Sequence, residues 1–206
     1  MEGTRRTRLS PDERRAQLIA LGVGALASGP LEALTIESLA ASAGVSRGLV
    51  IYYFGTKDGL HREVVRTACD SMLHATQPDD GLAPLDRLHD TLTRLVRFVR
   101  DHSLTFYSLV RGAASGDPEV RELIEETRTV QTGWLVGAFL ELGTPDSDQL
   151  RLALRSWVAF AEQTLVDGAL HSELASEEIV LFLDRTAKSI VAAAYDHGEG
   201  SEPLPR

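Results

Sequence analysis

The sequence has a single cysteine, Cys69, among its 206 residues, so no disulfide can form within the chain. A reducing compartment, the cytoplasm, is the expected location of such a protein. No segment approaches the roughly 18 uncharged apolar residues that a membrane-spanning helix needs, and no membrane partner is expected. A secretory signal is not expected either, because no apolar run follows Arg5, Arg6 and Arg8.

Sequence signatures of catalysis and of metal or cofactor binding are missing as well. There is no phosphate-binding glycine loop, no cluster with zinc-ligand spacing and no serine elbow. Asp86 and His89 are one helical turn apart, but the nearby sequence offers no third or fourth ligand. Cys69 has no strong basic cluster beside it and is expected to be a small buried hydrophobe. We therefore expect no enzyme, no catalytic or metal-binding residue and no cofactor.

The net charge of −9 is unevenly distributed along the chain. Residues 1–66 hold nine Arg and Lys against seven Asp and Glu, whereas residues 67–206 hold twelve against twenty-three. Exposed charges are screened beyond about 10 Å at 0.1 M salt, so a basic face can approach DNA although the body of the protein is acidic. The distribution permits DNA binding.

Strand patterns are nearly absent, and apolar residues recur with the period of an α-helix through most of the chain. We therefore expect an all-α fold of about nine helices. The first helix is expected to begin after Ser10, because Ser10, Pro11 and Glu13 together form a helix-start signature with a capping box. Gly29 and Pro30 end it.

The stretch GVSRGLVIYYFGTK, residues 44–57, predicts a helix end, a tight turn and a short helix with an exposed surface. Gly44 suits the left-handed conformation that ends the preceding helix, and Ser46 is an N-cap only two residues later. Helices joined by so tight a turn should cross steeply, with Val50 and Phe54 in the angle between them. This is the geometry of a helix-turn-helix, whose second helix enters the major groove of DNA.

Three segments, TIESLA (residues 35–40), GVSRGLVIYYF (44–54) and TKDGL (56–60), resemble the DNA-binding domain of TetR-family transcriptional regulators. The resemblance covers about residues 11–70 and depends on several features at fixed spacing. Ile51 departs from the family pattern, in which an aromatic residue is common, and a hydroxyl contact made there would be lost. The rest of the chain is similar to the family only in helix count, helix length and acidity.

The resemblance implies that eight residues contact DNA, and their chemistry suits that role. Arg47 is the main base-reading candidate, since a guanidinium pairs with guanine O6 and N7. Lys57 is unfavourable for the dipole at a helix start, so a phosphate contact would account for it. Hydroxyls and tyrosine rings would meet phosphates, sugars and thymine methyls, and a glycine would allow close backbone approach. The expected DNA-binding residues are Thr35, Ser46, Arg47, Gly48, Leu49, Tyr52, Tyr53 and Lys57.

Several of these assignments have a purely structural alternative. Tyr52 and Tyr53 can be aromatics of the core or its rim, and Arg47 can be a solvated surface charge. Thr35 and Ser46 cap helices whether or not DNA is bound. An arm formed by the N-terminal arginines can reach the DNA backbone or a minor groove, or be an ordinary tail.

The acidic remainder predicts five further helices, of which the last two are apolar on more than one face. The eighth is expected from about Ser147 to Leu170 and the ninth from Ser176 to Tyr195. A helix that is apolar on two sides needs burial on two sides, and a partner can cover one of them.

The family resemblance implies that this partner is a second copy, joined in a twofold four-helix bundle. Such a dimer places two recognition helices ~34–36 Å apart on a pseudo-palindromic operator. A deeply wrapped monomer core is the alternative. The expected interface residues are Leu150, Leu154, Trp157, Leu165, Ile179, Leu183 and Ile190.

A pocket for an unidentified small-molecule effector is expected among helices four to eight. Arg111 is the most informative candidate, because its burial among aromatics would indicate an anionic or carbonyl ligand. Aromatics at helical spacing also form cores, which is the alternative for each candidate. The candidate lining residues are Phe98, His102, Phe106, Tyr107, Arg111, Trp134, Phe160 and Gln163.

Together, these expectations describe a ligand-responsive repressor that binds operator DNA as a homodimer. Residues 1–66 are expected to form the helix-turn-helix DNA-binding domain with its N-terminal arm, and residues 67–206 the helical effector-binding and dimerisation domain. Effector binding would favour a spacing of the recognition helices that no longer fits successive major grooves. Two alternatives stay open: a DNA-binding regulator without an effector, and a helical-bundle binding protein or enzyme that has lost DNA affinity.

Overall fold

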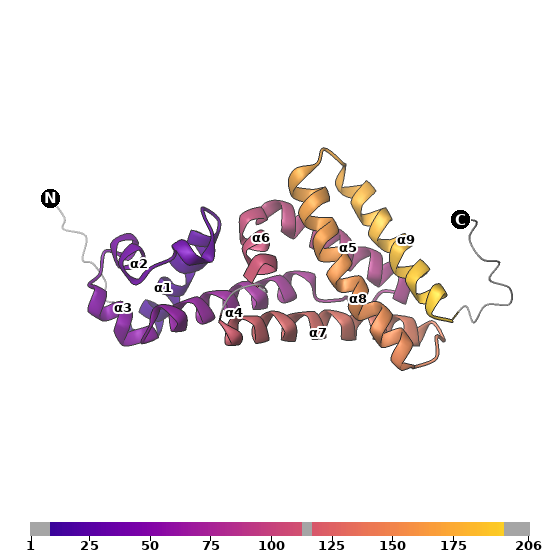
Figure 1. Cartoon of the computed structure of the whole chain (residues 1–206), viewed down its shortest axis with the longest axis horizontal. Helices are drawn as coiled ribbons and strands as arrows, with labels where there is room; N and C mark the ends of the chain where they lie inside the picture. The colour runs from indigo at the N-terminus through magenta and orange to yellow at the C-terminus, as the bar shows by residue number, and fades with distance from the viewer. Residues whose placement is uncertain (1–8, 113–116, 196–206) are drawn as a thin grey trace, which may run out of the picture. The chain divides into compact units, whose positions relative to one another are not determined.

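The computed structural model describes residues 9–112 and 117–195, and within these ranges it contains nine α-helices and no strand (Figure 1). The all-α prediction is therefore confirmed. A short 3₁₀ helix, η1 (Leu31–Ala33), and a π-helical turn, η2 (Val166–Leu170), complete the regular structure. The α-helices are α1 (Pro11–Leu26), α2 (Ile36–Ala43), α3 (Arg47–Phe54), α4 (Lys57–Thr76), α5 (Pro84–Asp101), α6 (Ser103–Gly112), α7 (Pro118–Glu141), α8 (Asp148–Leu165) and α9 (Ser176–Tyr195).

Contacts between residues divide the chain into two compact units. The first unit comprises Met1–Met72 and His102–Glu125, and the second comprises Leu73–Asp101 and Glu126–Arg206. Helix α6 and the start of α7 thus pack with the N-terminal helices. The expected division after residue 66 concerns function, and it stays a prediction.

The capping box expected at the start of α1 is present. The backbone N–H of Glu13 donates to Ser10 Oγ at 3.2 Å, and the backbone N–H of Ser10 donates to the Glu13 carboxylate at 2.7 Å. This hydrogen bond from the Ser10 backbone lowers the pKa of Glu13 below its usual value. Two of the backbone donors left free at a helix start are satisfied in this way.

The core of the first unit joins α1 to α4 at close range. A Cβ added to Gly22 on α1 would lie 2.5 Å from Cγ2 of Val64 on α4, so only glycine permits this approach. Cys69 is buried in the same core, as expected for a small hydrophobe. The largest fully buried side chains of this unit are Leu18, Leu26, Leu39, Leu60, Val50, Val64 and Val65.

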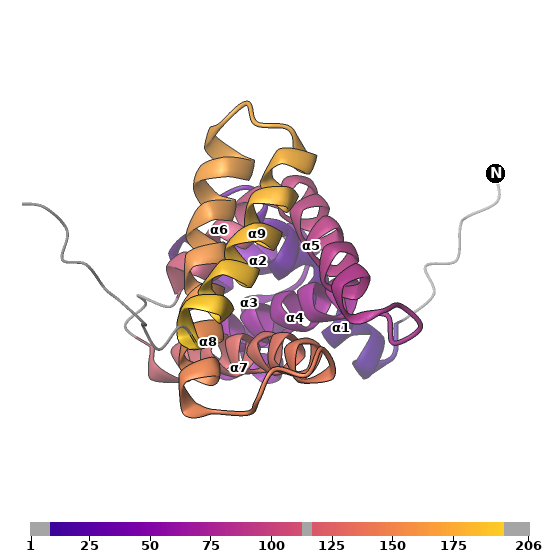
Figure 2. The ribbon, with the colours of Figure 1, turned by 90° about the vertical axis from the view of Figure 1, so that its right-hand side faces the viewer.

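The second unit is built around α9, which contacts both α5 and α8 (Figure 2). The indole Nε1 of Trp157 on α8 donates to Thr186 Oγ1 on α9 at 3.0 Å. On α7, Arg128 forms a two-pronged ion pair with Glu162 of α8, with a shortest distance of 2.6 Å. Both of these charged side chains are more than four-fifths buried.

Helix α8 ends earlier than the sequence predicts. Its α-helical hydrogen bonding stops at Leu165, and Val166–Leu170 continues as a π-helical turn instead of an α-helix. Gly168 in this turn lies against Ile179 of α9, where an added Cβ would meet Ile179 at 3.6 Å. A one-turn widening of this kind does not change the periodicity of the apolar residues. The sequence therefore predicts an α-helix as far as Leu170 and does not reveal the π-helical turn.

Candidate nucleic-acid interface

The turn between α2 and α3 has the expected local structure. The hydroxyl of Thr35 accepts from Ser38 N at 3.0 Å at the start of α2. Gly44 ends that helix with φ of 62°, a conformation that strongly favours glycine. Ser46 caps α3, because its hydroxyl accepts from Leu49 N at 3.2 Å. Three residues therefore separate two capped helices, as in a helix-turn-helix.

Helix α3 buries one side and exposes the other. Val50 is fully buried and Phe54 is 8% exposed, so the inward side is anchored in the core of the first unit. Tyr52 is 78% exposed and Ile51 is 40% exposed, although both are large apolar or aromatic side chains. The short helix thus presents the Tyr52 ring and part of Ile51 to the outside.

Tyr53 occupies an intermediate position between these two sides. It is half-buried and packs against the core, while its ring meets the Tyr52 ring edge-on with centroids 5.2 Å apart. Tyr53 therefore supports Tyr52 from the rim of the core, in line with the structural alternative for this residue. Of the two tyrosines, Tyr52 is the one held outward.

Arg47 lies in the first turn of α3, with about two-thirds of its side chain exposed. Its Nε is 3.0 Å from an Oε1 carboxylate oxygen of Glu37, a residue in the first turn of α2. The motif does not single out Glu37, because the two residues are ten positions apart and belong to different helices. The one sequence feature that could have pointed to Glu37 is its expected position on the exposed face of α2.

Lys57 at the start of α4 has a partner within the chain. Its Nζ donates to the backbone carbonyl of Glu32 at 2.8 Å. This bond offsets part of the unfavourable interaction of the cation with the helix dipole, which the sequence alone attributes to a phosphate. The side chain remains exposed, so its predicted phosphate contact stays a prediction.

The remaining expected DNA contacts are also at or near the surface. Gly48 and Ser46 are exposed, and Leu49 and Thr35 are partly exposed. An added Cβ at Gly48 would come no closer than 3.9 Å to the Ser46 hydroxyl, so the backbone there is open on its outer side. The arginine arm, Arg5, Arg6 and Arg8, lies outside the described residues.

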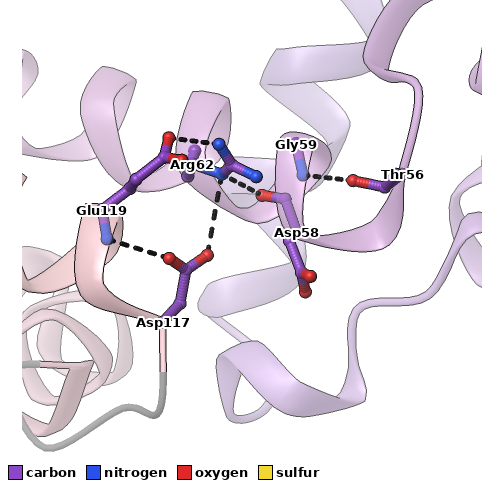
Figure 3. Close-up of polar contacts among 6 residues, drawn as sticks. All are labelled: Thr56, Asp58, Gly59, Arg62, Asp117 and Glu119. Atoms are coloured by element: carbon purple, nitrogen blue, oxygen red, sulfur yellow. Dashed lines mark hydrogen bonds and ion pairs between the residues drawn. The ribbon is translucent and has the colours of Figure 1, made fainter.

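A polar cluster fixes the start of α4 within the first unit (Figure 3). Arg62 forms an ion pair with Glu119 and lies 3.6 Å from the Asp117 carboxylate, both at the start of α7. The backbone N–H of Gly59 donates to Thr56 Oγ1 at 3.0 Å. A Cβ on Gly59 would lie 2.2 Å from the carbonyl oxygen of Phe54, so the end of α3 and the start of α4 touch through their backbones.

The expected dimer-interface residues face the interior of their own chain, which corrects the prediction. Six of the seven are at most 4% exposed, and only Ile190 is partly accessible. The apolar side chains that α8 and α9 do expose are different residues. They are Leu152 (67%), Phe160 (41%), Leu181 (37%) and Phe182 (49%).

The candidate effector residues are distributed between the two units. His102, Phe106, Tyr107 and Arg111 belong to the first unit, and the other four belong to the second. Arg111 is exposed, donates from Nε to the Tyr107 hydroxyl at 3.0 Å and lies over that ring at 5.2 Å, so it does not indicate a buried anion site.

Among the other candidates, Phe106 is buried and Phe98 and Trp134 are partly buried. Phe160 and Gln163 lie on the exposed side of α8. A shallow hollow of about 330 Å³ in the first unit is lined by residues of α1, η1 and α2 and by none of the eight candidates. The predicted pocket therefore stays a prediction.

Two further classes of site are not supported by the described residues. None of the described helices combines the length and apolarity required to cross a bilayer. Within residues 9–112 and 117–195, no three His, Cys, Asp or Glu side chains are grouped as metal ligands would be.

Two family models match the chain, and together they cover most of it. The bacterial regulatory proteins of the tetR family match residues 18–64, which include α2, the turn and α3. The tetracyclin repressor-like C-terminal domain matches residues 84–189, just over half of the chain. None of the curated proteins matches the sequence.

Solved structures show the same fold. A tetR-family transcriptional regulator from Streptomyces coelicolor is 25% identical, with a TM-score of 0.81 over 93% of this chain and 86% of that chain. A TetR-like transcriptional regulator from Rhodococcus sp. RHA1 is 20% identical, with a TM-score of 0.69 over 90% and 99%. The multidrug binding protein EbrR, complexed with imidazole, is 20% identical, with a TM-score of 0.63 over 84% and 94%.

Proposed function

Because the chain belongs to the tetR family of bacterial regulatory proteins, we propose that it is a repressor that binds a pseudo-palindromic operator as a homodimer. The observation that carries this proposal is the outward face of α3. Tyr52 is 78% exposed and the Arg47 side chain is about two-thirds exposed, on a short helix whose other side is buried in the core. A rigid helix with an exposed arginine and tyrosine suits the major groove, where guanidinium groups read guanine.

The proposed contacts fall into two chemical groups. Arg47 reads a base edge, and Leu49 and Tyr52 pack on sugars or thymine methyl groups. Thr35, Ser46 and Lys57 meet phosphates, and Gly48 lets the backbone approach, which fixes the register of α3 on the duplex. Both the acidic composition of the second half and the small basic surplus of the first are compatible with docking through one limited face.

The exposed apolar residues of α8 and α9 support the proposed homodimer. The rings of Phe160 and Phe182 lie 5.8 Å apart and both face outward. Leu152 lies two turns before Phe160 on α8, and Leu181 precedes Phe182 on α9. Neighbouring aromatics with a leucine on each helix make a surface that a second copy can cover in a twofold arrangement.

Replacing Phe160 and Phe182 together by glutamate is expected to dissociate this dimer. Aromatic anchors at the centre of an interface contribute about 2 kcal/mol or more each, and a buried unpaired carboxylate adds repulsion across the twofold axis. The dissociation constant, measured by sedimentation, should rise by at least about 100-fold. The control is Leu104→Glu, which places the same charge on an exposed leucine of α6. An unchanged dimer in the double variant would place the interface elsewhere.

A small molecule is the proposed signal that releases the operator. One structural relative is a multidrug binding protein, which supports a small organic ligand for this fold. The ligand must bind the DNA-free arrangement more tightly than the DNA-bound one, since equal affinity for both would shift nothing. A cytoplasmic location follows from the proposed DNA partner.

Footprinting of the full-length protein on the intergenic DNA beside its gene tests the proposed function. We expect protection of two half-sites with approximate twofold symmetry, about one helical turn apart. Affinity should fall steeply with salt, since each neutralised phosphate contributes a slope of about −0.9 in log K against log salt. If the protein binds neither this DNA nor any member of a random duplex library, it is a helical-bundle protein without DNA affinity.

A further inference from the structure

An acidic side chain lies beside the main base-reading residue on the proposed DNA face. Glu37 belongs to the first turn of α2, and its Oε1 is 3.0 Å from Nε of Arg47. Both side chains are about three-fifths or more exposed. A carboxylate at this place opposes binding to phosphates, so its presence beside Arg47 calls for a physical reason.

We propose that Glu37 is a specificity-determining residue that positions the Arg47 guanidinium for one orientation in the major groove. The proposal rests on the proposed function, because it concerns how the same face reads DNA. It assigns Glu37 a role in choosing a base pair rather than in holding the protein on the duplex.

The ion pair between Glu37 and Arg47 leaves the end of the guanidinium available. The carboxylate meets Arg47 at Nε, the guanidinium nitrogen nearest the side-chain stem. This contact leaves the terminal Nη1 and Nη2 groups to donate side by side. Guanine presents O6 and N7 as a matching pair of acceptors in the major groove. Glu37 therefore favours the end-on arrangement, in which both Nη groups face the base.

The backbone that holds Glu37 and Arg47 is well ordered by local hydrogen bonds. Thr35 caps α2 two residues before Glu37, and Ser46 caps α3 immediately before Arg47. Across the turn, Val45 N donates to the Ala40 carbonyl at 3.0 Å. Both helices also contribute buried side chains to the same core, which holds them relative to each other. A long arginine side chain loses less freedom on binding DNA when a neighbour already restricts it.

The Glu37–Arg47 ion pair is largely exposed to solvent. An ion pair in which both partners are mostly solvated contributes little to folding. The Glu37–Arg47 contact therefore has a small effect on the free energy of unfolding. On a face that docks to DNA, its effect is on how the Arg47 guanidinium meets the duplex. Loss of Glu37 should strengthen non-specific binding, since a negative charge is removed, and weaken base discrimination, since Arg47 becomes free to pair with phosphates.

The test is selection of a preferred sequence from a random duplex library by the full-length protein, followed by affinity measurements on single-base variants. The proteins compared are wild type, Glu37→Ala, Arg47→Ala and the double variant. We expect Glu37→Ala to reduce the preference at one base-pair position of each half-site by roughly threefold to tenfold. Arg47→Ala should lose preference at the same position, and Glu37→Ala should add nothing further to it.

The matched control is Glu32→Gln, which removes one negative charge from neighbouring η1 and leaves the Glu37–Arg47 pair in place. It should raise non-specific affinity slightly and leave the sequence preference unchanged. The inference is overturned if Glu37→Ala selects the wild-type sequence with undiminished preference, or loses preference where Arg47→Ala does not. If wild type itself selects no sequence, the proposed function fails, and that outcome is distinct from both.

Discussion

Replacing Arg47 and Tyr52 together by alanine is expected to weaken operator binding by about two orders of magnitude. A bidentate arginine–guanine contact accounts for about 1–3 kcal/mol of discrimination. The exposed Tyr52 ring adds apolar burial that only a bound duplex provides. Neither side chain is part of the core, so the variant should unfold at the wild-type temperature. Operator affinity is measured by fluorescence anisotropy at fixed salt concentration, because salt changes every phosphate contact.

The chain offers a matched control for this double variant. Arg111 and Tyr107 on α6 are the same two residue types, and they also contact each other, with Arg111 Nε 3.0 Å from the Tyr107 hydroxyl. Replacing both by alanine removes the same charge and the same ring, and operator affinity should stay within about twofold. Undiminished binding after the change at Arg47 and Tyr52 would require a different DNA-binding face.

Loss of Arg128 is expected to cause the largest decrease in stability. Arg128 on α7 and Glu162 on α8 form a two-pronged ion pair, and their side chains are 17% and 16% exposed. The hydrogen bonds to Glu162 raise the pKa of the Arg128 guanidinium, so it remains charged. Arg128→Ala leaves the Glu162 carboxylate without its partner in a largely buried position, which costs about 3–5 kcal/mol in the free energy of unfolding. This loss in the free energy of unfolding is measured by chemical denaturation, with circular dichroism as the signal.

An exposed ion pair of the same geometry provides the comparison. Arg151 holds Asp146 through Nε and Nη2 at 2.9 and 2.7 Å, but both side chains are more than half exposed. Arg151→Ala should therefore cost less than about 1 kcal/mol. Replacing Arg128 by methionine and Glu162 by leucine together should recover most of the stability, because no charge is then left buried. Equal losses for Arg128→Ala and Arg151→Ala would contradict the role of burial.

Helix boundaries could be predicted from the sequence because capping is local. Ser10, Thr35 and Ser46 each bond a backbone N–H three residues later, so the residue type and its position are sufficient. Gly44 was predictable for the same reason, since its positive φ favours glycine strongly. The outward placement of Tyr52 followed from helical periodicity once both ends of α3 were located.

The surface proposed for the dimer could not be predicted in the same way. Helices α8 and α9 are apolar over much of their circumference, and periodicity alone does not say which stripe their own unit covers. Leu150, Leu154 and Leu183 proved to be fully buried inside the chain, whereas Phe160 and Phe182 are exposed. The distinction depends on how α8 and α9 pack on each other and on where α5 packs against α9, which are tertiary properties.

Glu37 and the partner of Lys57 were missed for a related reason. Each contact joins side-chain or backbone atoms of two different elements, ten or more residues apart in the sequence. A helix-turn-helix motif predicts that α2 and α3 meet, but it does not predict which exposed side chains of the two helices form a pair. That information requires the crossing angle and the side-chain rotamers.

The joint between α3 and α4 restricts how the proposed ligand can act on the proposed DNA binding. Only two residues separate these helices, and Gly59 leaves no space between its own backbone and the Phe54 carbonyl. Helix α3 therefore has no hinge of its own and cannot swivel while α4 stays still. The proposed ligand can therefore release the operator only by moving α3 and α4 together as one rigid piece. A longer, flexible linker at this joint would let the operator stay occupied while the ligand is bound.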